Sequence, residues 1–452
     1  MSAPSIILIV SLGVSALLFM VLKFRLNAFI ALLLTSILVG ILTGMPLSGI
    51  TKSIQEGMGN TLGFIATVVG LGAIFGQMLG SSGGAKSLAR YLLGRFGDRR
   101  ATWALALTGY IVGIPIFLDV GFIILIPVVY AIARNAKKSL LYYAIPLLAG
   151  LAVTHAMVPP TPGPTAVAQI LGVDLGWVVL FGLIIGLPVT IIAGPVFGRH
   201  IAGKIDVQAP RELMEANAGQ AGKDEDLPRF GIIAAIISVP LVLILLSTFI
   251  KFGIEKNIVA AGLFTEILVF IGHPFCALII ATLLSIILCL KRKFSKEAIL
   301  ELSTKALGPA GIIILVTGAG GVLKQILVDS GIGKTLAESI AGSSIPVIVL
   351  AWVLAAVVRI TQGSATVAMI TSASLISPVT QSLRIGQPKA ALVVMAIASG
   401  ATILSHVNDS GFWIVSKYLG MNEKQTLRSW TVMETIIAVS GLLFTLLASV
   451  FV

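Results

Sequence analysis

Apolar runs of bilayer-spanning length recur from one end of this 452-residue chain to the other. About 20 consecutive apolar residues carry a helix across the hydrocarbon core of a membrane. Runs near this length include Ile6–Val21, Ala28–Leu42, Gly231–Ser247 and Val432–Val452. Charged residues make up only 11% of the chain, whereas a soluble domain carries roughly a quarter. The sequence therefore predicts an all-α polytopic membrane protein.

The net charge of +12 comes largely from Lys and Arg in short loops between the apolar runs. Cytoplasmic loops of membrane proteins carry an excess of these residues. If every cluster is cytoplasmic, the loops alternate consistently, with both chain ends outside and roughly ten crossings. Membrane topology and lipid contact thus account for the charge, and no nucleic-acid partner is predicted. The clusters are Lys23/Arg25, 86–100, 134–138, 199–229, 291–305 and 417–428.

The chain also contains an internal repeat. Gly72–Arg90 (GAIFGQMLGSSGGAKSLAR) aligns without a gap with Gly320–Glu338 (GGVLKQILVDSGIGKTLAE). In the predicted topology the first segment runs from outside to inside and its copy runs from inside to outside. We therefore expect two inverted transmembrane repeats, 1–198 and 230–452, joined by a cytoplasmic linker at 199–229. Secondary transporters often have this plan, with the substrate bound near the midplane.

Each half has two polar interruptions of its apolar sequence. The first half has PIFLDVGF (115–122) and THAMVPPTPGPTA (154–166), and the second has RITQGSATVA (359–368) and SHVNDSGFW (405–413). Two of these interrupt the long segments 101–133 and 345–383, which we interpret as re-entrant hairpins of two short helices. The other two predict broken helices. We thus expect about five transmembrane helices, one hairpin and one broken helix in each half.

The residue types at these breaks suit an anion site. The prolines of PPTPGP prevent a continuous helix, so a new helix is expected to begin near Thr165. A helix N-terminus beside hydroxyl groups attracts anions through its free N–H groups and its dipole. An ionised acid at the bilayer centre costs about 2.5–3.5 kcal/mol, so Asp119 and Asp409 need a reason to be there. For Asp409, both helix capping and a role as proton carrier or ligand contact stay open.

Other polar residues also leave alternatives open. His155 and His406 either satisfy carbonyl groups freed by the breaks or contact a ligand. Arg359 is placed at a hairpin base, where it pairs with lipid or another helix, with substrate contact as the alternative. The spacing of residues shows neither a metal-ligand set nor an activated nucleophile, so no metal and no cofactor is predicted.

The four breaks, with HPF at His273 and AGGVLKQILVDSG at 319–331, resemble the gluconate permease family of bacterial sugar-acid:proton symporters, within the ion transporter superfamily. The resemblance covers essentially the whole chain. It implies proton-driven uptake of gluconate or a related hydroxy acid across the bacterial inner membrane, by alternating access of an elevator type. It also implies two inverted repeats and a homodimer.

Carried over by position, the resemblance implies a substrate site and a proton-coupling site. Asp119 and Asp409 are the implied proton-coupling residues. Relatives often have Glu at the position of Asp119 and His at that of Thr161, which leaves the exact sugar acid open. The implied substrate-binding residues are Thr154, His155, Thr161, Gly163, Thr165, Gln362, Gly363, Ser364, Thr366, Ser405, His406, Asn408 and Ser410.

Other functions remain as alternatives to this hypothesis. Sodium coupling or exchange of another small organic anion is the first, because carbonyls and hydroxyls at unwound helices also suit Na⁺. A channel is less expected, since a pore does not need two copies of a hairpin and a broken helix. An intramembrane enzyme is also less expected, since nothing in the sequence brings Asp119 and Asp409 within mutual reach as a catalytic pair.

Overall fold

The computed structural model describes residues 3–136, 138–208, 210, 227–331 and 346–452, and within these residues every regular element is helical. The all-α prediction is confirmed. The first half of the chain forms α1 (Ala3–Leu22), α2 (Ala28–Leu42), α3 (Leu47–Ser81), α4 (Gly84–Phe96), the short turn η1 (Asp98–Arg100), α5 (Ala101–Val112), α6 (Leu118–Ala136), α7 (Leu141–Met157), α8 (Pro162–Leu171), α9 (Leu175–Ile191), the π-turn η2 (Ile192–Val196) and α10 (Phe197–Ala202).

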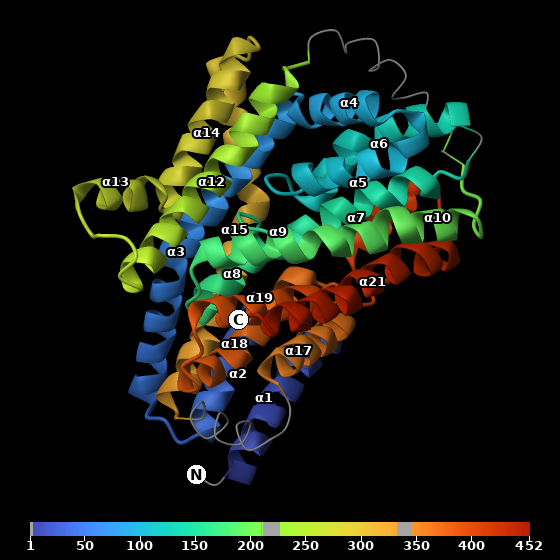
Figure 1. The fold of residues 1–452 in the computed structure, drawn as a ribbon. Helices are drawn as coiled ribbons and strands as arrows, with labels where there is room; N and C mark the ends of the chain where they lie inside the picture. The colour runs from blue at the N-terminus through green and yellow to red at the C-terminus, as the bar shows by residue number, and fades with distance from the viewer. Residues whose placement is uncertain (1–2, 137, 209, 211–226, 332–345) are drawn as a thin grey trace.

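The second half forms a similar series of helices (Figure 1). They are α12 (Phe230–Glu255), α13 (Leu263–Ile271), α14 (Pro274–Lys291), α15 (Lys296–Asp329), α17 (Val347–Gln362), α18 (Ala365–Ser382), α19 (Gln387–Gly400), α20 (Ser410–Leu419) and α21 (Glu423–Ser449). Most of the expected linker, namely residues 209 and 211–226, lies outside the described residues, as do residues 332–338 of the second repeat copy and Ile345.

Seven helices in the described part of the chain are long and apolar enough to cross a membrane. They are α3, α7 with α8, α9 with α10, α12, α14, α15 and α21. Large apolar side chains such as Leu283, Ile312 and Leu443 are exposed on them. Exposed leucines and isoleucines of this kind suit contact with lipid tails, which are equally apolar. The chain is therefore a multi-pass membrane protein.

Small residues let the two longest helices, α3 and α15, pack closely. A Cβ atom on Gly57 of α3 would lie 2.7 Å from the carbonyl oxygen of Gly321, and one on Gly321 would lie 2.0 Å from Thr61 Oγ1. Glycine at such positions allows membrane helices to approach backbone to backbone. Figure 1 shows α3, α12 and α14 side by side at one edge, whereas α5, α7, α9 and α21 extend away from them at a steep angle.

The repeat segments end their helices alike. α3 is followed by Gly83 and α15 by Gly331, with left-handed φ angles of 80° and 75°. Glycine adopts this conformation without the clash that a Cβ atom causes, and it commonly ends helices. The aligned glycines therefore have the same local role. The inverted orientation of the two halves stays a prediction.

Helix breaks occur in all four polar segments. Residues 113–117 separate α5 from α6, and residues 158–161 separate α7 from α8. Gly363 and Ser364 separate α17 from α18, and residues 401–409 separate α19 from α20. The expected start of α8 near Thr165 is wrong, because the helix begins three residues earlier at Pro162. Proline is tolerated in the first turn, where its missing N–H has no helical partner to lose.

Candidate functional site

A cavity of about 460 Å³ lies where the breaks of the two halves meet. Its walls come from the start of α6, the end of α7, the start of α8, the tip between α17 and α18, and the connection between α19 and α20, with residues of α15 and α21 completing it. This volume is in the range of small-molecule sites, about 300–1,000 Å³. The predicted site residues that line it are Asp119, His155, Gly163, Gln362, Gly363, Ser364, Thr366, Asn408, Asp409 and Ser410.

The tip between α17 and α18 is held by a glycine and a serine. Gly363 has a left-handed φ of 80°, and the Ser364 hydroxyl caps α18 by accepting from the Val367 N–H at 3.4 Å. A Cβ atom on Gly363 would lie 2.3 Å from the carbonyl oxygen of Asn408. Only glycine therefore lets the hairpin tip and the second broken helix pack this closely.

Asp409 has several partners at the start of α20. Its Oδ1 accepts from the Gly411 N–H at 3.1 Å, so Asp409 caps the broken helix, one of the two roles that the sequence left open. Its Oδ2 lies 2.6 Å from Arg359 Nη2 and accepts from the Ser405 hydroxyl at 2.5 Å. The Ser405 oxygen in turn accepts from Trp430 Nε1 at 2.7 Å. These bonds fix the carboxylate at the edge of the cavity.

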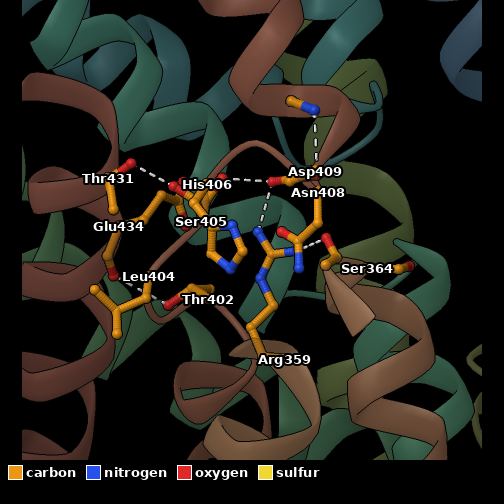
Figure 2. Close-up of polar contacts among 12 residues, drawn as sticks. Arg359, Ser364, Thr402, Leu404, Ser405, His406, Asn408, Asp409, Thr431 and Glu434 are labelled. Atoms are coloured by element: carbon orange, nitrogen blue, oxygen red, sulfur yellow. Dashed lines mark hydrogen bonds and ion pairs between the residues drawn. The ribbon is translucent and has the colours of Figure 1, made fainter. Parts of the chain in front are cut away.

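The placement of Arg359 at a hairpin base is wrong. The break of this hairpin falls at Gly363 and Ser364, so Arg359 lies on the last turn of α17 before the tip. Its side chain is 3% exposed, lines the cavity and points to Asp409 (Figure 2). Nη1 donates to the carbonyl oxygen of Gly363, while Nε is buried without a hydrogen-bond partner.

Two more polar side chains of the cavity have buried atoms without partners. His155 Nδ1 makes no hydrogen bond, and its ring and that of Phe117 form a T-shaped pair with centroids 5.9 Å apart. Both amide atoms of Gln362 are buried and unpaired. Buried polar groups nearly always have partners, so these atoms suit a polar ligand. Asp119, in the first turn of α6, is exposed.

The other predicted residues do not line the cavity. The hydroxyls of Thr154, Thr161 and Thr165 donate to backbone carbonyls three or four residues earlier, at 3.0, 2.6 and 2.7 Å. Threonine in or near a helix often bonds in this way. Ser405 is fully buried behind Asp409. His406 Nε2 lies 3.1 Å from the carbonyl oxygen of Ile360, which is the carbonyl-satisfying role left open for it.

Several cavity residues were not among the predicted site residues. Besides Arg359 they include Thr402, Trp430 and Glu434. Glu434 is 4% exposed in α21, and it lies near enough to Arg359 and Asp409 to interact with both electrostatically. A lone acid inside the apolar sequence of a membrane-spanning helix is a signal that could have identified it. Among the described residues, no group of three or more His, Cys, Asp or Glu could hold a metal ion.

Comparison with known proteins agrees with the resemblance in the sequence. The family model described as GntP family permease matches residues 5–451. The low-affinity gluconate transporter of Escherichia coli is 41% identical over 437 residues, which is 96% of each chain. The gluconate permease of Pseudomonas aeruginosa is 41% identical over 428 residues, 94% of each chain. The Gnt-II system L-idonate transporter of Escherichia coli is 37% identical over 440 residues, 97% of each chain.

Solved structures of transporters share the fold. The YdaH transporter of Alcanivorax borkumensis matches with a TM-score of 0.59 at 14% identity, over 88% of each chain. The MtrF protein of Neisseria gonorrhoeae, described as one of a class of antimetabolite efflux pumps, matches with a TM-score of 0.62 at 15% identity, over 88% of this chain and 84% of its own. At these identities the likeness shows the fold alone.

The predictions of a transporter rather than an enzyme, and of a multi-pass protein of the bacterial inner membrane, are confirmed by the family match and the membrane-length helices. The family model matches nearly the whole chain, and relatives about 40% identical match over nearly their whole length. This chain therefore belongs to the GntP family of permeases.

Proposed function

We propose that this permease takes up gluconate or a related sugar acid together with protons. The observation that carries the proposal is the charge of the cavity wall. Three acids line it, Asp119, Asp409 and Glu434, whereas Arg359 is the only lysine or arginine among the described lining residues. An anion that enters this site meets a negative surface unless acids there bind protons. Substrate binding and proton binding therefore support each other.

The polar groups of the cavity suit a polyhydroxylated acid. The Ser364 and Thr366 hydroxyls, the Asn408 amide and the unpaired amide of Gln362 line it. Such groups bind hydroxyls, and a site built for hydroxyls discriminates strongly against molecules that lack them. The relatives are named for gluconate and for L-idonate. These names support a sugar acid as the substrate of this chain.

We also propose an elevator-type movement within a homodimer, as the resemblance implies. The cavity is built mainly from hairpin tips and broken helices, while no residue of α3, α12 or α14 lines it. These three helices stand together at one edge (Figure 1). This separation supports a mobile, substrate-carrying group of helices that moves against a fixed scaffold.

Asp409 and Asp119 are our proposed proton-coupling residues, and their asparagine variants test the role. Asparagine mimics the protonated acid, so Asp409→Asn is expected to retain exchange of labelled gluconate across proteoliposomes. It is expected to lose uphill uptake driven by a pH gradient. Asp119→Asn is measured in the same way. If both variants still concentrate gluconate at the wild-type rate, the proton binds elsewhere.

A further inference from the structure

Among the described residues that line the cavity, one is a permanent cation, Arg359, and it is already bound to an acid of the protein. Arg359 is 3% exposed and pairs with Asp409 Oδ2 at 2.6 Å. Arginine is the residue best suited to carboxylates, because its planar guanidinium presents several donors in a fixed fork. A buried cation of this kind in an apolar helix is costly unless it is paired. The structure accordingly pairs the buried Arg359 with a carboxylate, that of Asp409.

We propose that Arg359 binds the carboxylate of the substrate, and that Asp409 and the substrate compete for this guanidinium. The inference rests on the proposed function, since it requires an anionic substrate. The only Lys or Arg among the described lining residues is Arg359, so no other permanent cation there attracts a carboxylate. Its Nε is buried without a partner, so the guanidinium keeps donors beyond those bound to Asp409 and Gly363.

The surroundings of Arg359 suit an exchange of partners. Asp409 keeps other bonds when it releases the guanidinium, because its Oδ1 still accepts from the Gly411 N–H and its Oδ2 from Ser405. Ser405 is fixed by Trp430, so this arrangement does not depend on Arg359. The substrate carboxylate, with hydroxyls along its chain, then lies between Arg359 and the polar side chains of the tip.

The exchange also links binding to protonation. Asp409 shares the cavity wall with three other titratable groups, namely Glu434 of α21, Asp119 of α6 and His155 of α7, and it lies near enough to Glu434 and His155 to interact with both electrostatically. A protonated Asp409 carries no charge and no longer competes for the guanidinium. Proton binding at Asp409 and substrate binding at Arg359 therefore favour each other.

Affinities of purified protein for gluconate and for sorbitol test the proposal. Sorbitol is gluconate with a hydroxymethyl group in place of the carboxylate, so it lacks the group that Arg359 recognises. Wild type is expected to prefer gluconate by about 10- to 150-fold, the effect of a hydrogen bond to a charged group. In Arg359→Gln this preference should disappear, and in Arg359→Lys it should be reduced. Lys324→Gln is the matched control, since Lys324 of α15 is a partly buried cation that does not line the cavity.

Asp409→Asn is expected to change the affinity for gluconate in the opposite direction from Arg359→Gln. Removal of the competing carboxylate is expected to tighten gluconate binding and leave sorbitol binding unchanged. A folded Arg359→Gln with the wild-type preference for gluconate overturns the proposal, as does an Asp409→Asn that binds gluconate more weakly. If Arg359→Gln does not fold, Arg359→Lys and Asp409→Asn decide. If wild type binds no gluconate, the proposal of gluconate as substrate fails instead, and the same variants are compared on L-idonate and on the alcohol that lacks its carboxylate.

Discussion

Two serines, one at the hairpin tip and one beside Asp409, are expected to have different roles, one in substrate binding and one in stability. Ser364 lines the cavity, so Ser364→Ala is expected to weaken gluconate binding by about 0.5–1.5 kcal/mol, or up to about 3 for a bond to the carboxylate. Ser405 is buried, and its loss leaves Trp430 Nε1 unpaired, so Ser405→Ala should cost about 1–3 kcal/mol of unfolding free energy. Titration calorimetry and thermal unfolding in detergent measure the two effects. If Ser405→Ala instead weakened gluconate binding and left the stability unchanged, Ser405 would belong to the binding site.

The residue contacts of the site were harder to predict than its location. Asp119 and Asp409 stood out because acids are rare in apolar sequence, and both line the cavity. The threonines looked like ligands, but a hydroxyl in a helix can satisfy itself on the preceding turn. The partner of Arg359 lies fifty residues away in sequence. No periodicity shows such a contact, because it depends on how separate elements pack.

At the scale of elements, the tip at Gly363 depends on the absence of a side chain. Gly363→Ala places a Cβ atom in a left-handed conformation and 2.3 Å from the Asn408 carbonyl oxygen. We expect a loss of at least about 1–2 kcal/mol of stability from the conformation alone, together with loss of gluconate binding. Gly59→Ala is the matched control, because a Cβ atom there meets nothing within 4 Å in the middle of α3. Equal melting temperatures for the two variants would contradict this account of the tip.

Asp174 joins elements of the two halves at the start of α9. Its carboxylate accepts from the Gly176 N–H at 2.9 Å, from Thr248 of α12 at 2.5 Å and from Lys251 at 3.1 Å. Burial acts to raise the pKa of Asp174, but the bonds to Thr248 and Gly176 and the charge of Lys251 bring it below its ordinary value of 3.8. The stabilisation is therefore complete above that ordinary value and is lost as the pH falls through the lower folded-state pKa.

Asp174→Ala tests this link between the halves. At pH 7 we expect a loss of about 0.5–2 kcal/mol of stability, as for other helix caps. The difference from wild type should shrink as the pH falls below about 4, where the wild-type carboxyl takes up its proton. Asp174→Asn keeps a capping oxygen and loses the charge, so its stability at pH 7 should lie between that of wild type and that of Asp174→Ala. If the stability difference between wild type and Asp174→Ala instead grows as the pH falls, the carboxylate of Asp174 does not stabilise the fold in this way.

The breaks between helices were predictable from the sequence because their causes are local. Proline removes a backbone donor and glycine permits left-handed φ, so both mark the ends of helices in the sequence itself. The exact start of α8 was missed by three residues, since proline also suits a first turn. The pairing of the breaks around one cavity was implied by the resemblance. Their packing, such as Gly363 against Asn408, needed the structure.

For the whole molecule, the basic clusters predict the topology. In a Cys276→Ala/Cys289→Ala background, a cysteine in place of the exposed Lys293 should react with an impermeant maleimide only after cells are permeabilised. A cysteine in place of the exposed Val452 should react from outside intact cells. These outcomes follow from cytoplasmic basic loops and an external C-terminus. Labelling of position 293 from outside would contradict the proposed topology.

The central claim is that gluconate uptake is driven by protons, and proteoliposomes that contain only this protein test it most directly. Labelled gluconate is supplied outside while a pH gradient, acid outside, or an inward sodium gradient is imposed separately. We predict transient accumulation above the external concentration under the pH gradient, abolished by a protonophore. We predict none under the sodium gradient alone. Accumulation that follows sodium and ignores the pH gradient would contradict the account.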